Sequence, residues 1–218
     1  MKSLYLFSGL GTDTRLFQNF GPIDGLEIVP LPWIHPGDSK TLGDYADLLM
    51  ETYDFKTPCW VGGVSMGGMI AQELAARIKP EGQVLISTAR SIKEMPLLFE
   101  WTKKIRLENF MHKPFLEVVA KIGDPFTIKS KEGRALFRQM LKDADPDLMK
   151  FGAQAILNWQ PSDNNTKTIR IHGTNDRVFP IKKVGETIKI LDGNHFMVYE
   201  KGVEITQELN ERIKKLSD

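Results

Sequence analysis

This chain has little cysteine, no marked excess of charge of either sign and no long apolar run. Its 218 residues include a single cysteine, Cys59, which excludes an internal disulfide. The apolar run around Cys59 predicts a buried structural thiol. The sequence contains no group of Cys and His at zinc spacing. A net charge of +1 leaves no broad basic field for nucleic acid and no acidic tail.

Membrane-spanning and exported classes are also disfavoured. No apolar run approaches the roughly 18 residues of a membrane span, and the N-terminal apolar stretch is shorter than the apolar region of a signal peptide. We therefore expect a cytoplasmic protein. Apolar content of 41% and charged content of 26% are ordinary for a globular chain, and the length suits one α/β domain with a sizeable core.

What the chain does contain is the pattern G-x-S-x-G, at Gly63-Val64-Ser65-Met66-Gly67. A short apolar run of strand composition precedes it, and a segment of helix composition follows it. In this context the motif places a serine at the apex of a strained turn, and the two glycines let that turn close. Alone, the pattern also fits a Gly-rich turn with a serine at a helix N-terminus, so the rest of the chain has to decide.

The order of the predicted elements indicates a parallel sheet. Strands and helices alternate along the first 90 residues, which is typical of parallel strands covered by helices. Thr41 and Asp44 form a rough capping box at the start of one of these helices. We expect strands at 4–7, 26–30, 58–61, 83–88, 168–173 and 187–191, and helices at 42–53, after the motif, and at 200–216.

Residues 91–160 have a different character. Apolar residues recur there at helical spacing over 97–110, 114–122, 132–142 and 146–158, with prolines at the breaks. Roughly 70 helical residues are too many for a simple crossover. We therefore predict that 91–160 form a helical cap inserted over the carboxyl edge of a core made of 1–90 and 161–218. The alternative is that some of these helices only flank the sheet.

A competing motif follows the first strand. Gly9-x-Gly11 suggests a dinucleotide-binding turn, but Thr14 stands where that fingerprint needs Gly or Ala. The next helix is short, and Glu27 is poorly placed to bind a ribose. The other interpretation is that this loop supplies the backbone N–H of Leu10 to an oxyanion hole.

Three side chains with catalytic potential follow predicted strands. Ser65, Asp176 and His195 each stand just after a strand, and the carboxyl ends of parallel strands share one edge, where ligands bind. The order Ser, Asp, His is that of the α/β-hydrolase arrangement, and it differs from the orders in chymotrypsin and subtilisin.

The chain resembles the α/β-hydrolase fold superfamily in three stretches, Gly63–Gly68, the H-G-x-x-D-x-x-x-P pattern of His172–Pro180, and Gly193–His195. The resemblance covers about residues 2–90 and 165–216 and implies a mostly parallel sheet of about six strands flanked by helices. The segment predicted as a cap matches no motif. Two departures are the Ser8-Gly9 pair, where many members have His-Gly, and the absence of two N-terminal strands.

The roles that follow are those of a serine hydrolase. Ser65 is the expected nucleophile, His195 the general base and Asp176 the group that orients His195. The backbone N–H groups of Leu10 and Met66 are the expected oxyanion hole. We expect cleavage of a small carboxylic ester, thioester or lactone through an acyl-enzyme, with a small acyl substrate as partner and without a metal or organic cofactor.

Other chemistries stay open at this point. The same triad serves acyl transfer, C–C hydrolysis and lyase reactions, and a protein of this fold can bind a ligand without catalysis. A haloalkane dehalogenase is disfavoured because an aspartate would have to stand at Ser65.

Several residues compete for the site. His35 is expected at the same edge, but its position before Ser65 in the chain does not fit the order Ser, Asp, His. His172 stands at a strand end and is expected to be structural. Asp192 is the rival acid, and its closeness to His195 in sequence suggests that it shapes that loop. Trp33, Phe99 and Trp101 are the expected lining of an acyl pocket, although any of them can be plain core.

Overall fold

The structure is a computed structural model that describes residues 1–95 and 128–217. The helices predicted at 97–110 and 114–122 lie outside the described residues, and so do the pocket candidates Phe99 and Trp101. Of the predicted cap region 91–160, the structure describes residues 91–95 and 128–160.

Six strands form one sheet, in the order β2-β1-β3-β4-β5-β6, and every neighbouring pair is parallel. The predicted α/β class with about six parallel strands is confirmed. The strands are β1 (Lys2–Phe7), β2 (Leu26–Pro30), β3 (Cys59–Val64), β4 (Gly82–Ile86), β5 (Lys167–Gly173) and β6 (Ile188–Ile190).

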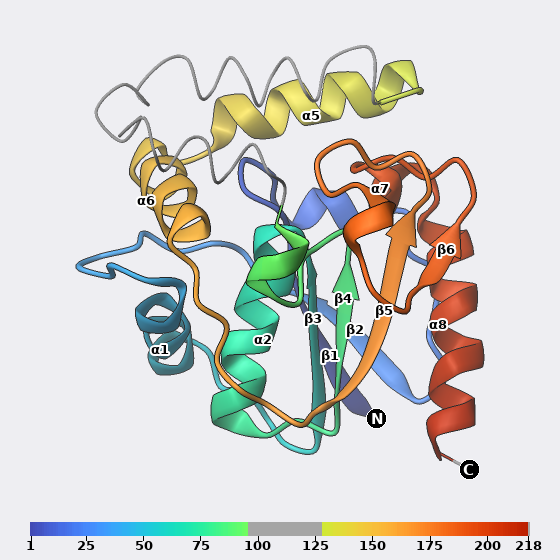
Figure 1. Cartoon of the computed structure of the whole chain (residues 1–218), viewed down its shortest axis with the longest axis horizontal. Coiled ribbons are helices and arrows are strands. Elements are labelled where there is room, and N and C mark those ends of the chain that lie inside the picture. Colours follow the sequence, from blue (N-terminus) through green and yellow to red (C-terminus); the bar gives the residue numbers. More distant parts are fainter. Residues whose placement is uncertain (96–127, 218) are drawn as a thin grey trace.

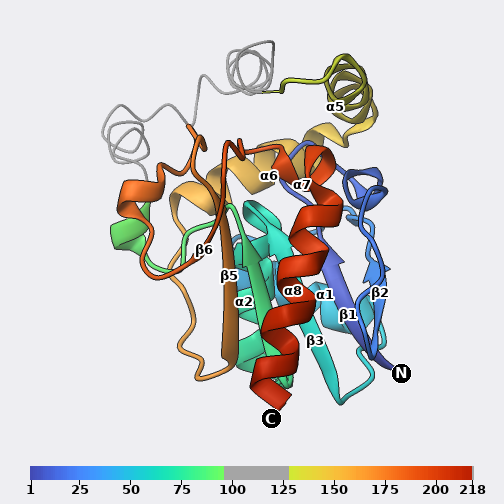
Figure 2. The same cartoon turned by 90° about the vertical axis from the view of Figure 1, so that its right-hand side faces the viewer.

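Helices cover both faces of this sheet. Figures 1 and 2 show α1 and α2 on one face and α8 on the other. The helix predicted at 200–216 is α8, which starts at Gly202, and a separate short helix, α7, ends just before it at Glu200. The helices are α1 (Leu42–Thr52), α2 (Met66–Ile78), α5 (Lys131–Asp143), α6 (Pro146–Leu157), α7 (Met197–Glu200) and α8 (Gly202–Ser217), with 3-10 turns η1 (Thr14–Phe17), η2 (Ile92–Glu94) and η4 (Ile181–Lys183).

Alternating side chains of the strands divide the core into two sides. In β4, Val84 and Ile86 pack in the cluster that includes Ile205 and Leu209 of α8. Leu85, between them, packs against α2 on the other face. Successive residues of a strand point to opposite faces, so the apolar runs of these strands follow from burial on both sides.

Two helices lie beyond the carboxyl ends of the strands. Figure 1 shows α5 and α6 across the end to which the arrowhead of β5 points. Phe151 of α6 packs on Tyr45 of α1, with ring centroids 5.2 Å apart. Phe137 of α5 packs on Phe196 at 5.5 Å. This position agrees with the predicted cap, while the division of the chain into a core and a cap stays a prediction.

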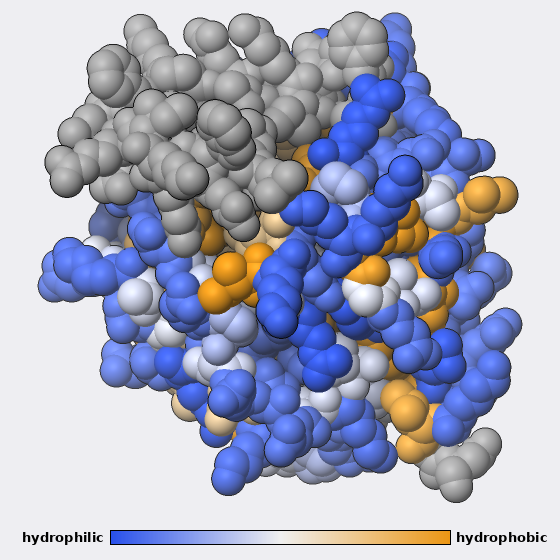
Figure 3. Space-filling model, in the orientation of Figure 1, coloured by the Kyte–Doolittle hydropathy of each residue, from blue (hydrophilic) through white to orange (hydrophobic). Residues whose placement is uncertain are grey.

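The visible surface is mostly polar. Figure 3 shows hydrophilic residues over most of the coloured face, with hydrophobic ones in small groups. Within the described residues, no helix combines the length and the apolar character that crossing a lipid bilayer requires.

Candidate active site

Strand register brings the ends of four strands to one edge. Phe7 of β1 pairs with Gly63 of β3, and Val64 pairs with Ile86 of β4. Ile86 in turn pairs with Ile171 of β5. Ser65 and Asp176 follow two of these strands, β3 and β5, and His195 follows β6, whose Ile190 pairs with Gly173 of β5. The three catalytic candidates therefore emerge at the same edge.

Ser65 stands at a sharp turn between β3 and α2. Its backbone has φ 54° and ψ −119°, a conformation that residues with a side chain rarely adopt. A Cβ atom at Gly63 would lie 2.3 Å from the carbonyl carbon of Gly67, and one at Gly67 would lie 2.2 Å from the carbonyl oxygen of Phe7. Both glycines are therefore required by close backbone approach, as the motif predicted.

Asp176 and His195 are in contact. His195 Nδ1 lies 2.9 Å from Asp176 Oδ2. The other oxygen, Oδ1, accepts hydrogen bonds from the backbone N–H groups of Val178 and Phe179, both at 2.9 Å. Asp176 is 5% exposed, whereas the His195 side chain is 23% exposed. The acid is thus held inside, and the histidine reaches the surface of the site.

The charge of Asp176 fixes the tautomer of His195. Burial alone raises the pKa of this carboxyl, but the contact with His195 and the N–H of Phe179 bring the pKa below its ordinary value. An ionised carboxylate only accepts hydrogen bonds, so His195 Nδ1 carries the proton that it donates to Asp176. With a neutral ring, Nε2 then has a free lone pair.

His172 supports the loop that carries the acid. Its Nε2 lies 2.7 Å from the carbonyl oxygen of Phe179 and 3.5 Å from Asp176 Oδ2. Burial lowers the pKa of His172, so a neutral ring donates to the carbonyl. This is consistent with the structural role predicted for His172.

Two competing residues have other partners. His35 Nε2 lies 3.4 Å from Asp147 Oδ2 near the start of α6, and both side chains are mostly exposed. Asp192 accepts a hydrogen bond from the Asn175 side chain at 3.1 Å, and its own N–H donates to Thr174 Oγ1 at 2.9 Å. Its contacts are those of a residue that shapes the loop before His195.

The loop after β1 lies against Ser65, where the oxyanion hole was predicted. A Cβ atom at Gly9 would lie 3.5 Å from Ser65 Cβ. Met66 is the first residue of α2, so its N–H has no intrahelical acceptor. The side chains of Leu10 and Met66 meet at α6, because a Cβ atom at Gly152 would lie 2.6 Å from Leu10 Cδ1 and 2.8 Å from Met66 Sδ.

Trp33 lies near this loop as well. Its indole N–H donates to the carbonyl oxygen of Gly9 at 3.4 Å. The ring packs between Phe7 and Tyr45, with centroid distances of 5.5 and 6.0 Å. These contacts suit a core residue that also supports the Gly9 loop, and its role as pocket lining stays a prediction.

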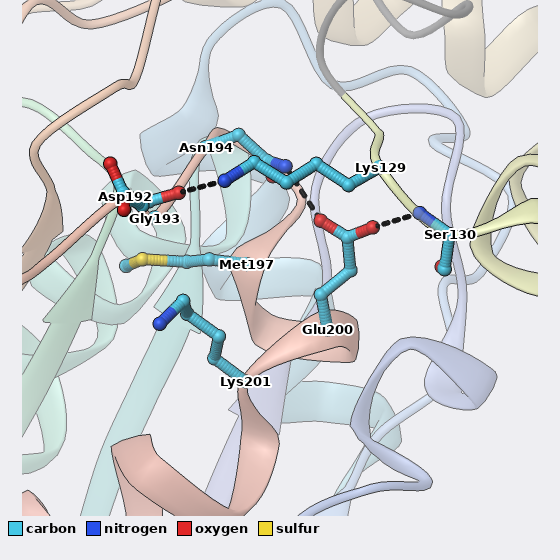
Figure 4. A pocket seen from close by; sticks show the side chains of 8 residues that line it. All are labelled: Lys129, Ser130, Asp192, Gly193, Asn194, Met197, Glu200 and Lys201. Atoms are coloured by element: carbon cyan, nitrogen blue, oxygen red, sulfur yellow. Dashed lines mark hydrogen bonds between the residues drawn. The ribbon is translucent and has the colours of Figure 1, made fainter.

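A cavity of about 420 Å³ opens beside the histidine loop. Figure 4 shows Glu200 between the Asn194 side chain and the backbone N–H of Ser130, at 2.6 and 2.8 Å. Glu200 thereby links the loop of His195 to the start of α5. Lys129 and Lys201 also line the cavity. Within the residues that the structure describes, no three His, Cys, Asp or Glu side chains are placed to hold a metal.

Sequence reasoning missed the residues that hold the turn at Ser65 from outside the motif. Thr88 donates its hydroxyl hydrogen to the carbonyl oxygen of Ser65 at 2.7 Å. Gln72 bridges the carbonyl oxygens of Gly68 and Ala89. Neither belongs to a recognisable pattern, and only the adjacency of β3 and β4 reveals them.

Solved structures of low sequence identity share this fold. A thermophilic esterase from Thermogutta terrifontis matches with a TM-score of 0.72 and 18% identity, over 99% of this chain and 90% of that one. Olei00960, a hydrolase from Oleispira antarctica, matches with 0.74 and 16%, over 98% and 91%. A protein from a study of carboxylesterases of Nitrososphaera gargenis matches with 0.71 and 16%, over 99% and 91%.

These likenesses establish the fold. The chain has the α/β-hydrolase fold, as its resemblance to that superfamily implied. No family model and no curated protein matches it.

Proposed function

We propose that the protein is a serine hydrolase that cleaves a small carboxylic ester, thioester or lactone. The observation that carries the proposal is the contact of ionised Asp176 with His195, at the sheet edge where Ser65 occupies its strained turn. A serine hydroxyl is a weak nucleophile near pH 7 and needs such a base. The names of the structural neighbours, esterases and a hydrolase, support the same chemistry.

The proposed reaction has two halves. Ser65 Oγ attacks the acyl carbonyl while His195 Nε2 takes the hydroxyl proton, and the N–H groups of Leu10 and Met66 stabilise the oxyanion. The bond to the leaving group then breaks, and His195 delivers the proton to the departing oxygen or sulfur. Water attacks the acyl-enzyme by the same route in reverse, which releases the acid and restores Ser65.

The first test is intact mass after incubation with a small fluorophosphonate. We expect one adduct on the wild type and none on Ser65→Ala. Ser91→Ala is the matched control, because Ser91 is also partly exposed but has ordinary extended backbone. This variant should form the adduct like the wild type.

A second probe covers the case in which the fluorophosphonate does not reach the site. A small activated ester such as p-nitrophenyl acetate should be hydrolysed by the wild type and not by Ser65→Ala. If folded wild type neither forms the adduct nor hydrolyses the ester, the proposal is wrong and the chain is a non-catalytic protein of this fold. Adduct formation with release of a transferred acyl product instead of the free acid would point to acyl transfer.

A further inference from the structure

The segment Ser87–Ala89 leaves the sheet beside the Ser65 turn. Ser87 has φ 46°, in the left-handed region, and its N–H donates to the carbonyl oxygen of Ile171 in β5 at 3.0 Å. The chain therefore bends sharply at the end of β4. The bend directs the next residue, Thr88, toward the neighbouring strand end, which is that of β3.

Thr88 is buried against the first turn of α2. It is 2% exposed, and its Oγ1 donates to the Ser65 carbonyl oxygen at 2.7 Å. Its methyl group packs closely as well, since a Cβ atom at Gly68 would lie 2.5 Å from Thr88 Cγ2. Thr88 thus has room only because residue 68 is glycine.

A second buried side chain fastens the same segment. Gln72 of α2 is 3% exposed, and its Nε2 donates to the carbonyl oxygens of Gly68 and Ala89 at 3.1 and 3.0 Å. The bond to Ala89 ties the residue directly after Thr88 to α2, while the N–H of Ser87, directly before it, is bonded to β5. Thr88 has little freedom to move away from Ser65.

The peptide that Thr88 holds also carries the Met66 N–H. The Ser65 carbonyl and the Met66 N–H belong to one planar peptide unit and point in opposite directions. Two other donors to the carbonyl, the N–H groups of Gly68 and Met69, come from within the turn itself. The Thr88 hydroxyl is the donor from outside this turn, in the segment that follows β4, so it fixes this plane relative to the sheet.

We infer that Thr88 is a positioning residue for the oxyanion hole: by holding the Ser65 carbonyl, its hydroxyl aims the Met66 N–H at the oxygen of the substrate. The inference rests on the proposed function, since it assumes that Ser65 reacts. An N–H that donates only to the developing oxyanion stabilises the transition state more than bound substrate. Loss of the Thr88 hydroxyl should therefore lower kcat and leave KM nearly unchanged.

The test compares Thr88→Val, which replaces the hydroxyl with a methyl group of similar size, with Thr88→Ser, which keeps it. We expect kcat on p-nitrophenyl acetate, and the rate constant of fluorophosphonate labelling, to fall about 10- to 100-fold in Thr88→Val. KM should change less than about threefold, and Thr88→Ser should stay within about threefold of the wild type on both readouts. Should Thr88→Val fail to fold, Thr88→Ala removes the same hydroxyl with less volume.

Thr206→Val is the matched control for lost stability. Thr206 is also 2% exposed, and its hydroxyl donates to helix carbonyls in α8, on the other face of the sheet. Its kinetics should match the wild type. An unchanged kcat in Thr88→Val would overturn the inference and leave the proposed function in place. A fall of kcat in Thr88→Ser or Thr206→Val equal to that in Thr88→Val would do the same. A folded wild type that does not react would overturn the proposed function, and the inference with it.

Discussion

Two carboxylates near His195 differ in what surrounds them. Asp176 is buried, accepts two backbone N–H groups and contacts His195 Nδ1 at 2.9 Å. Asp192 is exposed, and its side chain accepts from Asn175. A buried, fixed carboxylate holds an imidazole in one tautomer far better than a hydrated one. The proposed chemistry therefore assigns the orienting role to Asp176.

Replacement by asparagine separates the two acids. In Asp176→Asn, an amide that donates toward His195 favours the wrong tautomer, so we expect kcat for ester hydrolysis to fall about 10⁴-fold. Asp192→Asn keeps an oxygen that accepts from Asn175, and its kcat should stay within about threefold of the wild type. Steady-state kinetics of the two folded variants give the answer. Equal losses would mean that Asp192 shares the orienting role.

At the scale of single residues, the sequence alone predicts those residues that belong to a motif with a known backbone geometry. The spacing of the glycines around Ser65 follows from close backbone approach, so the turn could be predicted without the structure. Thr88 and Gln72 could not, because their contacts depend on β4 lying next to β3. Leu10 and Met66 were inferred from backbone chemistry, but their common contact with α6 at Gly152 depends on packing between distant segments.

Among the elements, a buried ion pair joins η2, β5 and the turn before β6. Arg170 donates to both oxygens of Glu94, at 2.9 and 2.6 Å, and the two side chains are 9% and 12% exposed. Glu94 also accepts from the N–H groups of Arg90 and Gly185. Burial alone raises the pKa of Glu94, but Arg170 and these N–H groups lower it on balance. The pair therefore persists as charged groups.

Replacing one member of this ion pair should lower the free energy of unfolding more than replacing both members. We expect Glu94→Gln to lower the free energy of unfolding by about 3 kcal/mol, since it leaves the Arg170 charge buried without its partner. The double variant Glu94→Leu, Arg170→Met should recover at least half of that loss. Urea unfolding of the wild type and both variants measures the effect. A loss below about 0.5 kcal/mol in Glu94→Gln would contradict this prediction, because it is the loss expected for an ion pair that water screens.

Element boundaries were predicted where local signals are strong. The Thr41–Asp44 capping box is present, and α1 starts at Leu42 as expected. β3 was predicted to end at Val61, yet it continues through Gly62 and Gly63 to Val64, because a central strand is held by neighbours on both sides despite the poor strand preference of glycine. β4 was predicted to reach Thr88, but the left-handed turn at Ser87 ends it at Ile86.

For the whole molecule, the packing of α6 bears on how the chain unfolds. Phe151, Ile156 and Trp159 belong to the same apolar cluster as Tyr45 and Met69. The Trp159 indole N–H donates to Glu73 of α2 at 2.9 Å, and both residues are buried. Residues 146–159 therefore share their apolar contacts with the sheet-covering helices, although they fall inside the segment predicted as a cap.

Because α6 shares its buried contacts with the helices that cover the sheet, we expect α6 and the sheet to open together. Amides of α6 should exchange with solvent only when the sheet opens, so their free energies of exchange should lie within about 1 kcal/mol of those of β3. Native-state hydrogen exchange measures both. The last turn of α8, with Lys214 and Lys215 exposed, is the internal control and should exchange through local fraying at a much lower free energy. Exchange of α6 near the level of that control would show that it opens apart from the sheet, as an independently moving cap does.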